Sequence, residues 1–110
     1  MAWSAAHRHS YARPTSIERA LRAALEAAGV SALPEYIVGP YAIDLALPEQ
    51  RIAIEADGDY WHGRPQQRAV DARKDAALTA VGWRVLRFKG SEIEANVDRC
   101  VAAVLTALAP

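Results

Sequence analysis

The sequence predicts a single α/β domain with the element order α-β-β-β-α-β-α and a mixed sheet flanked by helices. Its 110 residues match the size of one domain, and 52% apolar residues are enough for a thin core. Segments with helical periodicity alternate with shorter segments in which apolar and polar side chains alternate. Lys plus Arg and Asp plus Glu both number 13. A nucleic-acid partner would therefore require basic and acidic side chains to be segregated on the surface.

Residues 1–14 are expected to form an N-terminal arm, and residues 15–110 the domain. The arm mixes Trp, His, Arg and Tyr without a period, which fits a loose tail or a segment that contacts nucleic acid. Thr15 and Glu18 have the spacing of a capping box at the start of a helix, and Gly29 ends that helix. The apolar face of this helix is expected to contain Ile17, Ala20, Leu21, Ala24, Leu25 and Ala28.

Three strands, a helix, a strand and a final helix follow. The strands are expected at residues 35–39, 41–47, 51–57 and 83–88, and the helices at about 66–80 and from Ser91 onward, where Ser91-Glu92-Ile93-Glu94 has capping-box spacing. Turn residues Gly39-Pro40 and Pro48-Glu49-Gln50 separate the first three strands, which can form a meander. The helix between the third and fourth strands allows these two strands to be parallel neighbours.

The last strand and the last helix are expected to contribute to the core through Trp83, Leu86, Phe88 and Cys100. Arg84 and Arg87 are expected to be exposed and receive no role. Cys100 is the only cysteine, so no internal disulfide can form, and it is interpreted as a small buried hydrophobe. The sequence has neither an apolar signal segment nor a run of membrane-spanning length. These features favour a cytoplasmic protein.

The second and third strands together predict an acidic site. One face of the third strand is apolar, with Ile52, Ile54 and Ala56, and the other face carries Glu55 and Asp57. The second strand has an apolar face with Ile43, Leu45 and Leu47, and Asp44 points the opposite way. If both apolar rows face the core, Leu45 pairs with Ile54 and Leu47 with Ile52. This register places Asp44 directly across from Glu55, with about 5 Å between their Cβ atoms.

Facing carboxylates repel each other, and a divalent cation would offset that repulsion. Carboxylate oxygens suit Mg²⁺, Mn²⁺ or Ca²⁺ better than Zn²⁺. Mg²⁺ leaves coordination positions for water and for substrate phosphate. The alternative is that the acids are ordinary solvated charges, and spacing alone does not separate the two interpretations.

The segments Ile54-Glu55-Ala56-Asp57-Gly58-Asp59-Tyr60-Trp61-His62-Gly63, Asp71 to Leu78 and Gly82 to Phe88 resemble a known family. It is the family of proteins related to the very short patch repair endonuclease, within the restriction-endonuclease-like PD-(D/E)XK superfamily. The resemblance extends from about Thr15 to the end of the chain. It implies an α-β-β-β-α-β core, a metal-dependent endonuclease that uses Mg²⁺ (or Mn²⁺ as a substitute), and DNA as the substrate.

The resemblance also implies roles for individual residues. Asp44 looks like the metal-binding aspartate, Glu55 like the first acid of the third-strand motif, and Glu18 like the first-helix acid. Asp57 stands where the superfamily usually has lysine. It is a candidate third metal ligand or a residue that binds a metal-bound water, and the alternative is that it ends the strand at an Asp-Gly turn. For Glu18 the alternative is the capping box. For Asp44 the alternative is an ion pair with an arginine.

The loop and the helix that follow the acids supply the remaining candidates. His62 is a candidate general base or acid, with a structural role as the alternative. Tyr60 and Trp61 either contact bases or cap the core. Lys74 is a catalytic candidate that could replace the missing third-strand lysine. The candidates for phosphate contacts are Arg64, Arg68 and Arg73, each of which is otherwise a solvated charge.

Two classes of function remain open at this point. The first is an endonuclease with Asp44 and Glu55 at its centre. The second is a catalytically silent module of the same fold that binds nucleic acid or protein, which the missing lysine and the zero net charge support. Double-strand cleavage needs two sites and so a homodimer, whereas nicking needs one. The sequence does not choose between them.

Overall fold

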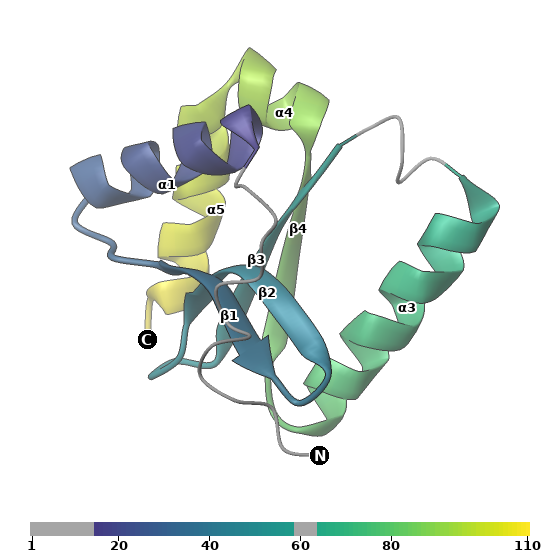
Figure 1. Cartoon of the computed structure of the whole chain (residues 1–110). Coiled ribbons are helices and arrows are strands. Elements are labelled where there is room, and N and C mark those ends of the chain that lie inside the picture. The colour runs from purple at the N-terminus through teal and green to yellow at the C-terminus, as the bar shows by residue number, and fades with distance from the viewer. Residues whose placement is uncertain (1–14, 59–63) are drawn as a thin grey trace.

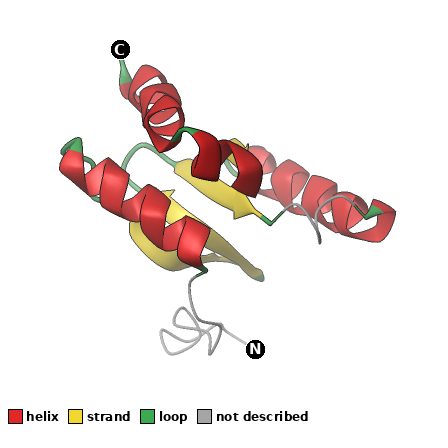
Figure 2. Cartoon of the chain, turned by 90° about the horizontal axis from the view of Figure 1, so that it is seen from above, coloured by secondary structure: helices red, strands yellow, loops and turns green. Residues whose placement is uncertain are grey.

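The computed structural model describes residues 15–58 and 64–110, and the predicted N-terminal arm lies outside these ranges. A four-stranded sheet lies between helices (Figures 1 and 2). The helices are α1 (Ser16–Ala27), α3 (Pro65–Ala80), α4 (Gly90–Ala95) and α5 (Val97–Leu108), and the strands are β1 (Leu33–Val38), β2 (Tyr41–Leu47), β3 (Ile52–Asp57) and β4 (Arg84–Lys89). The predicted α/β class with a mixed sheet is confirmed.

The strands lie in the order β1-β2-β3-β4. β1 to β3 form an antiparallel meander, and β3 and β4 are parallel, as their connection through a helix predicts. The pairing of β2 with β3 has the predicted register, with Leu45 opposite Ile54 and Leu47 opposite Ile52. The buried rows of these two strands therefore do set the register.

Helices α1, α4 and α5 cover one face of the sheet, and α3 covers the other (Figures 1 and 2). The larger core lies on the α1 side and includes Leu21, Leu25, Leu45, Ile54 and Val104. The smaller core lies on the α3 side and contains Ile43, Ala46, Ala53, Leu78 and Trp83. Among the described residues, no helix combines the length and the apolar character needed to cross a bilayer.

The turn and cap residues act as the sequence predicts. The Thr15 side chain accepts a hydrogen bond from the Glu18 backbone N–H at 3.3 Å and so caps α1. Gly29 adopts a φ of 85° just after α1, a conformation that glycine reaches without steric cost. Gly39 has a φ of 57° in the tight turn between β1 and β2.

Five local predictions are wrong. Ile43 belongs to the α3-side core and not to the row of Leu45 and Leu47. The side-chain alternation breaks between Ile43 and Leu45, next to Glu35 of β1, which has a φ of 50°. Ala20 and Ala28 on α1 are exposed. The C-terminal helix is split, because Asn96 leaves the helical conformation with a φ of −161° and caps α5. The capping box there joins Glu92 to the Lys89 backbone, so it begins two residues before the predicted Ser91. Arg87, expected to be exposed, is largely buried.

Candidate active site

The carboxylates of Asp44 on β2 and Glu55 on β3 each accept a hydrogen bond from a backbone N–H of the other strand. The Asp44 backbone N–H donates to Glu55 Oε2 at 2.9 Å, and the Ala56 backbone N–H donates to Asp44 Oδ2 at 2.9 Å. The regular backbone pairing of β2 with β3 stops at Leu45 and Ile54, so these carboxylates replace carbonyl acceptors at the point where the strands separate. The side chains are thereby fixed by the sheet backbone itself.

Asp44 also belongs to a second acidic group. One carboxylate oxygen each from Glu18, Glu35 and Asp44 can be chosen so that all three lie within 4.8 Å of one another. Glu18 comes from the first turn of α1, and Glu35 comes from β1. All three residues are partly buried. Three hard oxygen donors at this spacing are the ligand type that Mg²⁺ and Ca²⁺ prefer.

The acids are held in an environment that disfavours their charges. Burial, followed by the neighbouring Glu18 charge, raises the pKa of Asp44 to about 6. Burial and the Asp44 charge raise the pKa of Glu55 to about 7. Burial and the Glu35 charge likewise raise the pKa of Glu18. A bound cation would reverse this cost, because a cation favours the ionised form of every nearby carboxylate.

Lys74 brings a positive charge to the site from α3. Its ammonium group donates a short hydrogen bond to Glu55 Oε1 and another to the Ala42 carbonyl at 2.6 Å. The Lys74 side chain is 15% exposed and the Glu55 side chain is 4% exposed. This lysine of α3 therefore contacts an acid of β3, a different element of the fold.

Asp57 lies apart from the acidic group that contains Asp44. Arg87 Nη1 donates to both carboxylate oxygens of Asp57, at 2.8 and 2.9 Å. Arg87 Nη2 donates a short hydrogen bond to Asp75 of α3. Burial opposes the charge of Arg87, but the hydrogen bonds to Asp75 and Asp57 outweigh it and raise the pKa of Arg87, so the guanidinium stays charged. Asp57 is thus engaged by an arginine.

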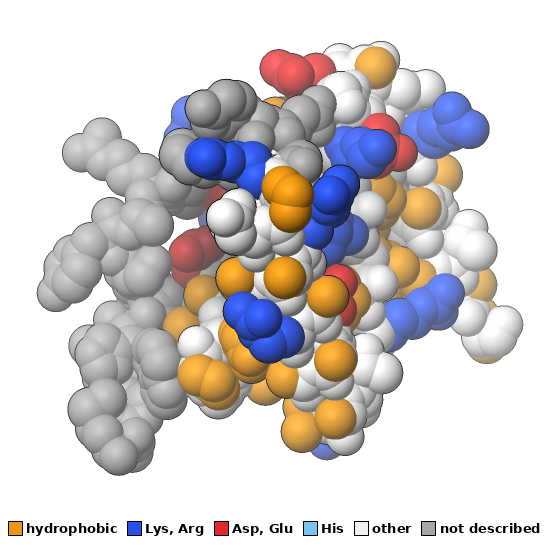
Figure 3. All heavy atoms as spheres, turned by 90° about the vertical axis from the view of Figure 1, so that its right-hand side faces the viewer, with side chains coloured by type: hydrophobic (Ala, Val, Ile, Leu, Met, Phe, Trp, Pro, Cys, Tyr) orange, Lys and Arg blue, Asp and Glu red, His pale blue; other side chains and the backbone are white. Residues whose placement is uncertain are grey.

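The three arginine candidates for phosphate contacts are all exposed, and they lie at the start of α3 or along it: Arg64, Arg68 and Arg73. The face of the molecule that carries α3 shows Lys and Arg side chains spread over it (Figure 3). Tyr60, Trp61 and His62 lie outside the described residues, so their predicted roles stay predictions. The described part of the candidate site thus combines partly buried acids with exposed arginines on α3 and just before it.

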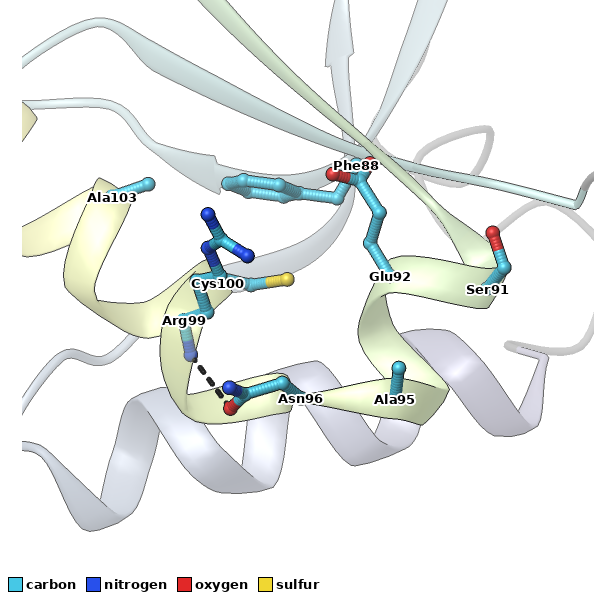
Figure 4. Close-up of a pocket in the computed structure, with 8 residues that line it drawn as sticks. All are labelled: Phe88, Ser91, Glu92, Ala95, Asn96, Arg99, Cys100 and Ala103. Carbon is cyan, nitrogen blue, oxygen red and sulfur yellow. Dashed lines mark hydrogen bonds between the residues drawn. The ribbon is translucent and has the colours of Figure 1, made fainter.

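A separate pocket of about 390 Å³ lies between β4, α4 and α5 (Figure 4). The ring of Phe88 and the thiol of Cys100 line it, and Asn96 accepts a hydrogen bond from the Arg99 backbone N–H at 3.2 Å beside it. Cys100 is 3% exposed, which confirms its interpretation as a buried hydrophobe. The residues lining this pocket include none of the acids grouped around Asp44.

Sequence reasoning missed two residues near the site. Glu35 falls within the first predicted strand, and pairing that strand with the second across the Gly39-Pro40 turn would have placed it opposite Asp44, because Val38 pairs with Tyr41. Arg87 was assigned no role. It is the direct register partner of Glu55 in the parallel pair of β3 and β4, and this register was a signal that could have found it.

Comparison with known proteins gives a family and a fold. The family model described as REase_MTES_1575 matches residues 17–108. The uncharacterised protein YcjD of Escherichia coli (strain K12) is 32% identical over 74 residues, which is 67% of this chain and 61% of YcjD. An uncharacterised protein of Haemophilus influenzae is 30% identical over 70 residues, 64% of this chain and 43% of that protein. The chain thus spans about three fifths or less of these curated relatives.

A solved structure is similar over most of the fold. The catalytic domain of the homing endonuclease I-Bth0305I aligns with a TM-score of 0.72 and 24% sequence identity, covering 84% of this chain and 93% of that domain. At this identity the likeness concerns the fold, a mixed four-stranded sheet flanked by helices. The family match covers nearly all of the described residues. The chain therefore belongs to the restriction-endonuclease-like family REase_MTES_1575.

Proposed function

We propose that this chain is a metal-dependent endonuclease that hydrolyses DNA phosphodiester bonds. The observation that carries the proposal is the position of Asp44. Its carboxylate groups with those of Glu18 and Glu35, and its backbone N–H donates a hydrogen bond to the Glu55 carboxylate. The family match and the likeness to the catalytic domain of a homing endonuclease support it. The resemblance of the third-strand segment to very short patch repair endonucleases adds further support.

Mg²⁺, with Mn²⁺ as a substitute, fits the donor set. The candidate ligands are the carboxylates of Asp44, Glu18 and Glu35, with Glu55 adjoining Asp44. When bound, the cation supplies a water of lowered pKa and neutralises charge on the phosphate. Asp57 is a weaker candidate ligand than the sequence suggested, because Arg87 already engages both of its oxygens.

Lys74 fulfils the role of the lysine that is absent from β3. Its ammonium group donates a hydrogen bond to Glu55 and so favours the ionised form, which burial and the Asp44 charge oppose. It would also present a positive charge to a substrate phosphate beside the acids. His62 remains the candidate for moving a proton to or from the reacting oxygens. The exposed Arg64, Arg68 and Arg73 would bind DNA phosphates, which makes binding weaker as salt concentration rises.

The direct test is cleavage of supercoiled plasmid and of single-stranded DNA in Mg²⁺, in Mn²⁺ and in EDTA. Wild type should cut only with a divalent cation, and Asp44→Ala should not cut. Glu49→Ala is the matched control, because Glu49 is an exposed acid in the turn between β2 and β3. It should cut like wild type. Cleavage by Asp44→Ala at the wild-type rate would overturn the proposal.

The second candidate function is a catalytically silent binding module. The observation in its favour is that Asp57, tied to Arg87, occupies the usual position of the superfamily lysine. A module of this kind would bind Mn²⁺ or DNA and cut neither plasmid nor single strands. The ratio of nicked to linear plasmid in the same assay also separates a single site from a homodimer that cuts both strands.

A further inference from the structure

Helix α3, which carries Lys74, packs on the sheet through little apolar surface. Of its sixteen residues only Leu78, close to its C-terminal end, is buried. No side chain caps its N-terminus. Its first turns lie farther from β4 than its last turn does (Figures 1 and 2). Polar contacts must therefore contribute much of what fixes the middle of α3 against β3 and β4.

Arg87 of β4 makes the central polar contact. Its Nη1 donates to both oxygens of Asp57 on β3, its Nη2 donates to Asp75 on α3, and Asp71 of α3 lies 3.9 Å from Nη1. One planar guanidinium thus bridges β4, β3 and α3. The Arg87 side chain is 22% exposed and the Asp57 side chain is 8% exposed. Charge-assisted hydrogen bonds to two partly buried carboxylates fix geometry better than a single surface ion pair does.

The two cationic contacts are linked by chain geometry. Lys74 and Asp75 are consecutive residues of α3, and Glu55 and Arg87 are register partners in the sheet. Fixing Asp75 on Arg87 therefore sets the rotation and height of α3 at the neighbouring Lys74. We propose that Arg87 is a positioning residue, which clamps α3 to the sheet so that the Lys74 ammonium stays on Glu55. The inference rests on the proposed function for its consequence in catalysis.

The clamp can be tested without any enzymatic activity. Lys74 and Lys89 are the only lysines in the chain, and Lys89 is exposed. An amine-reactive ester followed by peptide mass spectrometry should therefore label Lys89 first. In Arg87→Met, the labelling rate of Lys74 relative to Lys89 should rise severalfold, because local release of α3 exposes an amine whose side chain is only 15% exposed in the native structure. Arg84→Met, an exposed arginine of the same strand, should leave the ratio unchanged.

Asp75→Asn and Leu21→Ala separate positioning from general stability. Asp75→Asn weakens only the α3 side of the clamp, so it should also raise Lys74 labelling, and it keeps the test decisive if Arg87→Met does not fold. Leu21→Ala destabilises the opposite core and should not change the ratio. Unchanged Lys74 labelling in Asp75→Asn, or an equal rise in Leu21→Ala, would overturn the clamp whether or not the protein cuts DNA.

Cleavage kinetics then test the consequence. Arg87→Met should lower kcat about tenfold to hundredfold with little change in KM, because a displaced catalytic group loses orientation and not DNA binding. Lys74→Met combined with Arg87→Met should be no slower than Lys74→Met alone. Multiplying effects would show that Arg87 does not act through Lys74. Absence of cleavage by wild type would refute the proposed function, and the labelling experiment would still decide the clamp.

Discussion

Replacing Asp44 with asparagine should make the metal-free protein more stable and at the same time abolish cleavage. Burial and the Glu18 charge raise the pKa of Asp44 from its ordinary value of 3.8 to about 6. A carboxyl whose pKa is raised by folding favours the native state below its unfolded pKa, and this contribution is lost as pH rises through the folded pKa. At pH 8 the ionised Asp44 therefore destabilises the native state.

The size of the effect follows from the two pKa values. A difference of about two corresponds to about 3 kcal/mol at pH 8, which is an upper value. Asparagine keeps an oxygen to accept the Ala56 N–H hydrogen bond but loses the attraction to Lys74. A net gain of about 1–2 kcal/mol is expected, which raises Tm by roughly 5–10 °C for a domain of this size.

The assay is urea or thermal unfolding in EDTA at pH 8 and at pH 4. The gain of Asp44→Asn over wild type should be present at pH 8 and largely lost near pH 4, where the wild-type carboxyl is protonated in the native state and close to half protonated in the unfolded state. Glu49→Gln, in an exposed turn, should differ from wild type by less than about 0.5 kcal/mol at both pH values. A variant that is no more stable than wild type at pH 8 would refute the argument that burial strains this acid.

Three further predictions concern the metal, the core and the helix junction. Mg²⁺ or Mn²⁺ should raise Tm more at pH 8 than at pH 5.5, because Asp44 and Glu55, with pKa values of about 6 and about 7, must lose protons to bind a cation; equal shifts at both pH values would contradict this. Leu21→Ala, at a side chain with 0% exposure, should cost about 2–5 kcal/mol in urea unfolding, and a cost below about 1 kcal/mol would count against the α1-side core. Gly90→Ala should destabilise by about 1–2 kcal/mol, since its Cβ would lie 3.2 Å from Ile17 Cδ1 and 3.3 Å from a backbone oxygen of β3; wild-type stability would show that this approach can relax.

Much of the fold follows from periodicity and turn chemistry. The apolar rows of β2 and β3 have only one register that buries both, and this register brings Asp44 to Glu55. The split between α4 and α5 could not be predicted in the same way. The apolar spacing continues past Asn96, and it is tertiary packing that decides whether Asn96 stays helical or caps a new helix.

The part of the site that sequence patterns did not reveal depends on contacts between distant elements. Lys74 is a candidate from the sequence, but the local sequence does not indicate that its ammonium group contacts Glu55, nineteen residues away. The same holds for Arg87, which reads as an ordinary polar position on a half-buried strand. The parallel register of β3 and β4 and the position of α3 along the sheet together bring Lys74 to Glu55 and Arg87 to Asp57 and Asp75.

Glu35 shows why the site departs from regular structure. A non-glycine residue with a φ of 50° costs about 1–2 kcal/mol, and the pairing of β1 with β2 is interrupted at this residue, between Pro34 and Tyr36. The distortion accompanies the convergence of Glu35 with Asp44 and Glu18, an arrangement that also carries electrostatic repulsion. Both costs fall on the same few residues, and a divalent cation would offset the electrostatic one. A site selected for ligand binding would combine backbone strain and electrostatic repulsion in the same residues, whereas a site selected for stability would not.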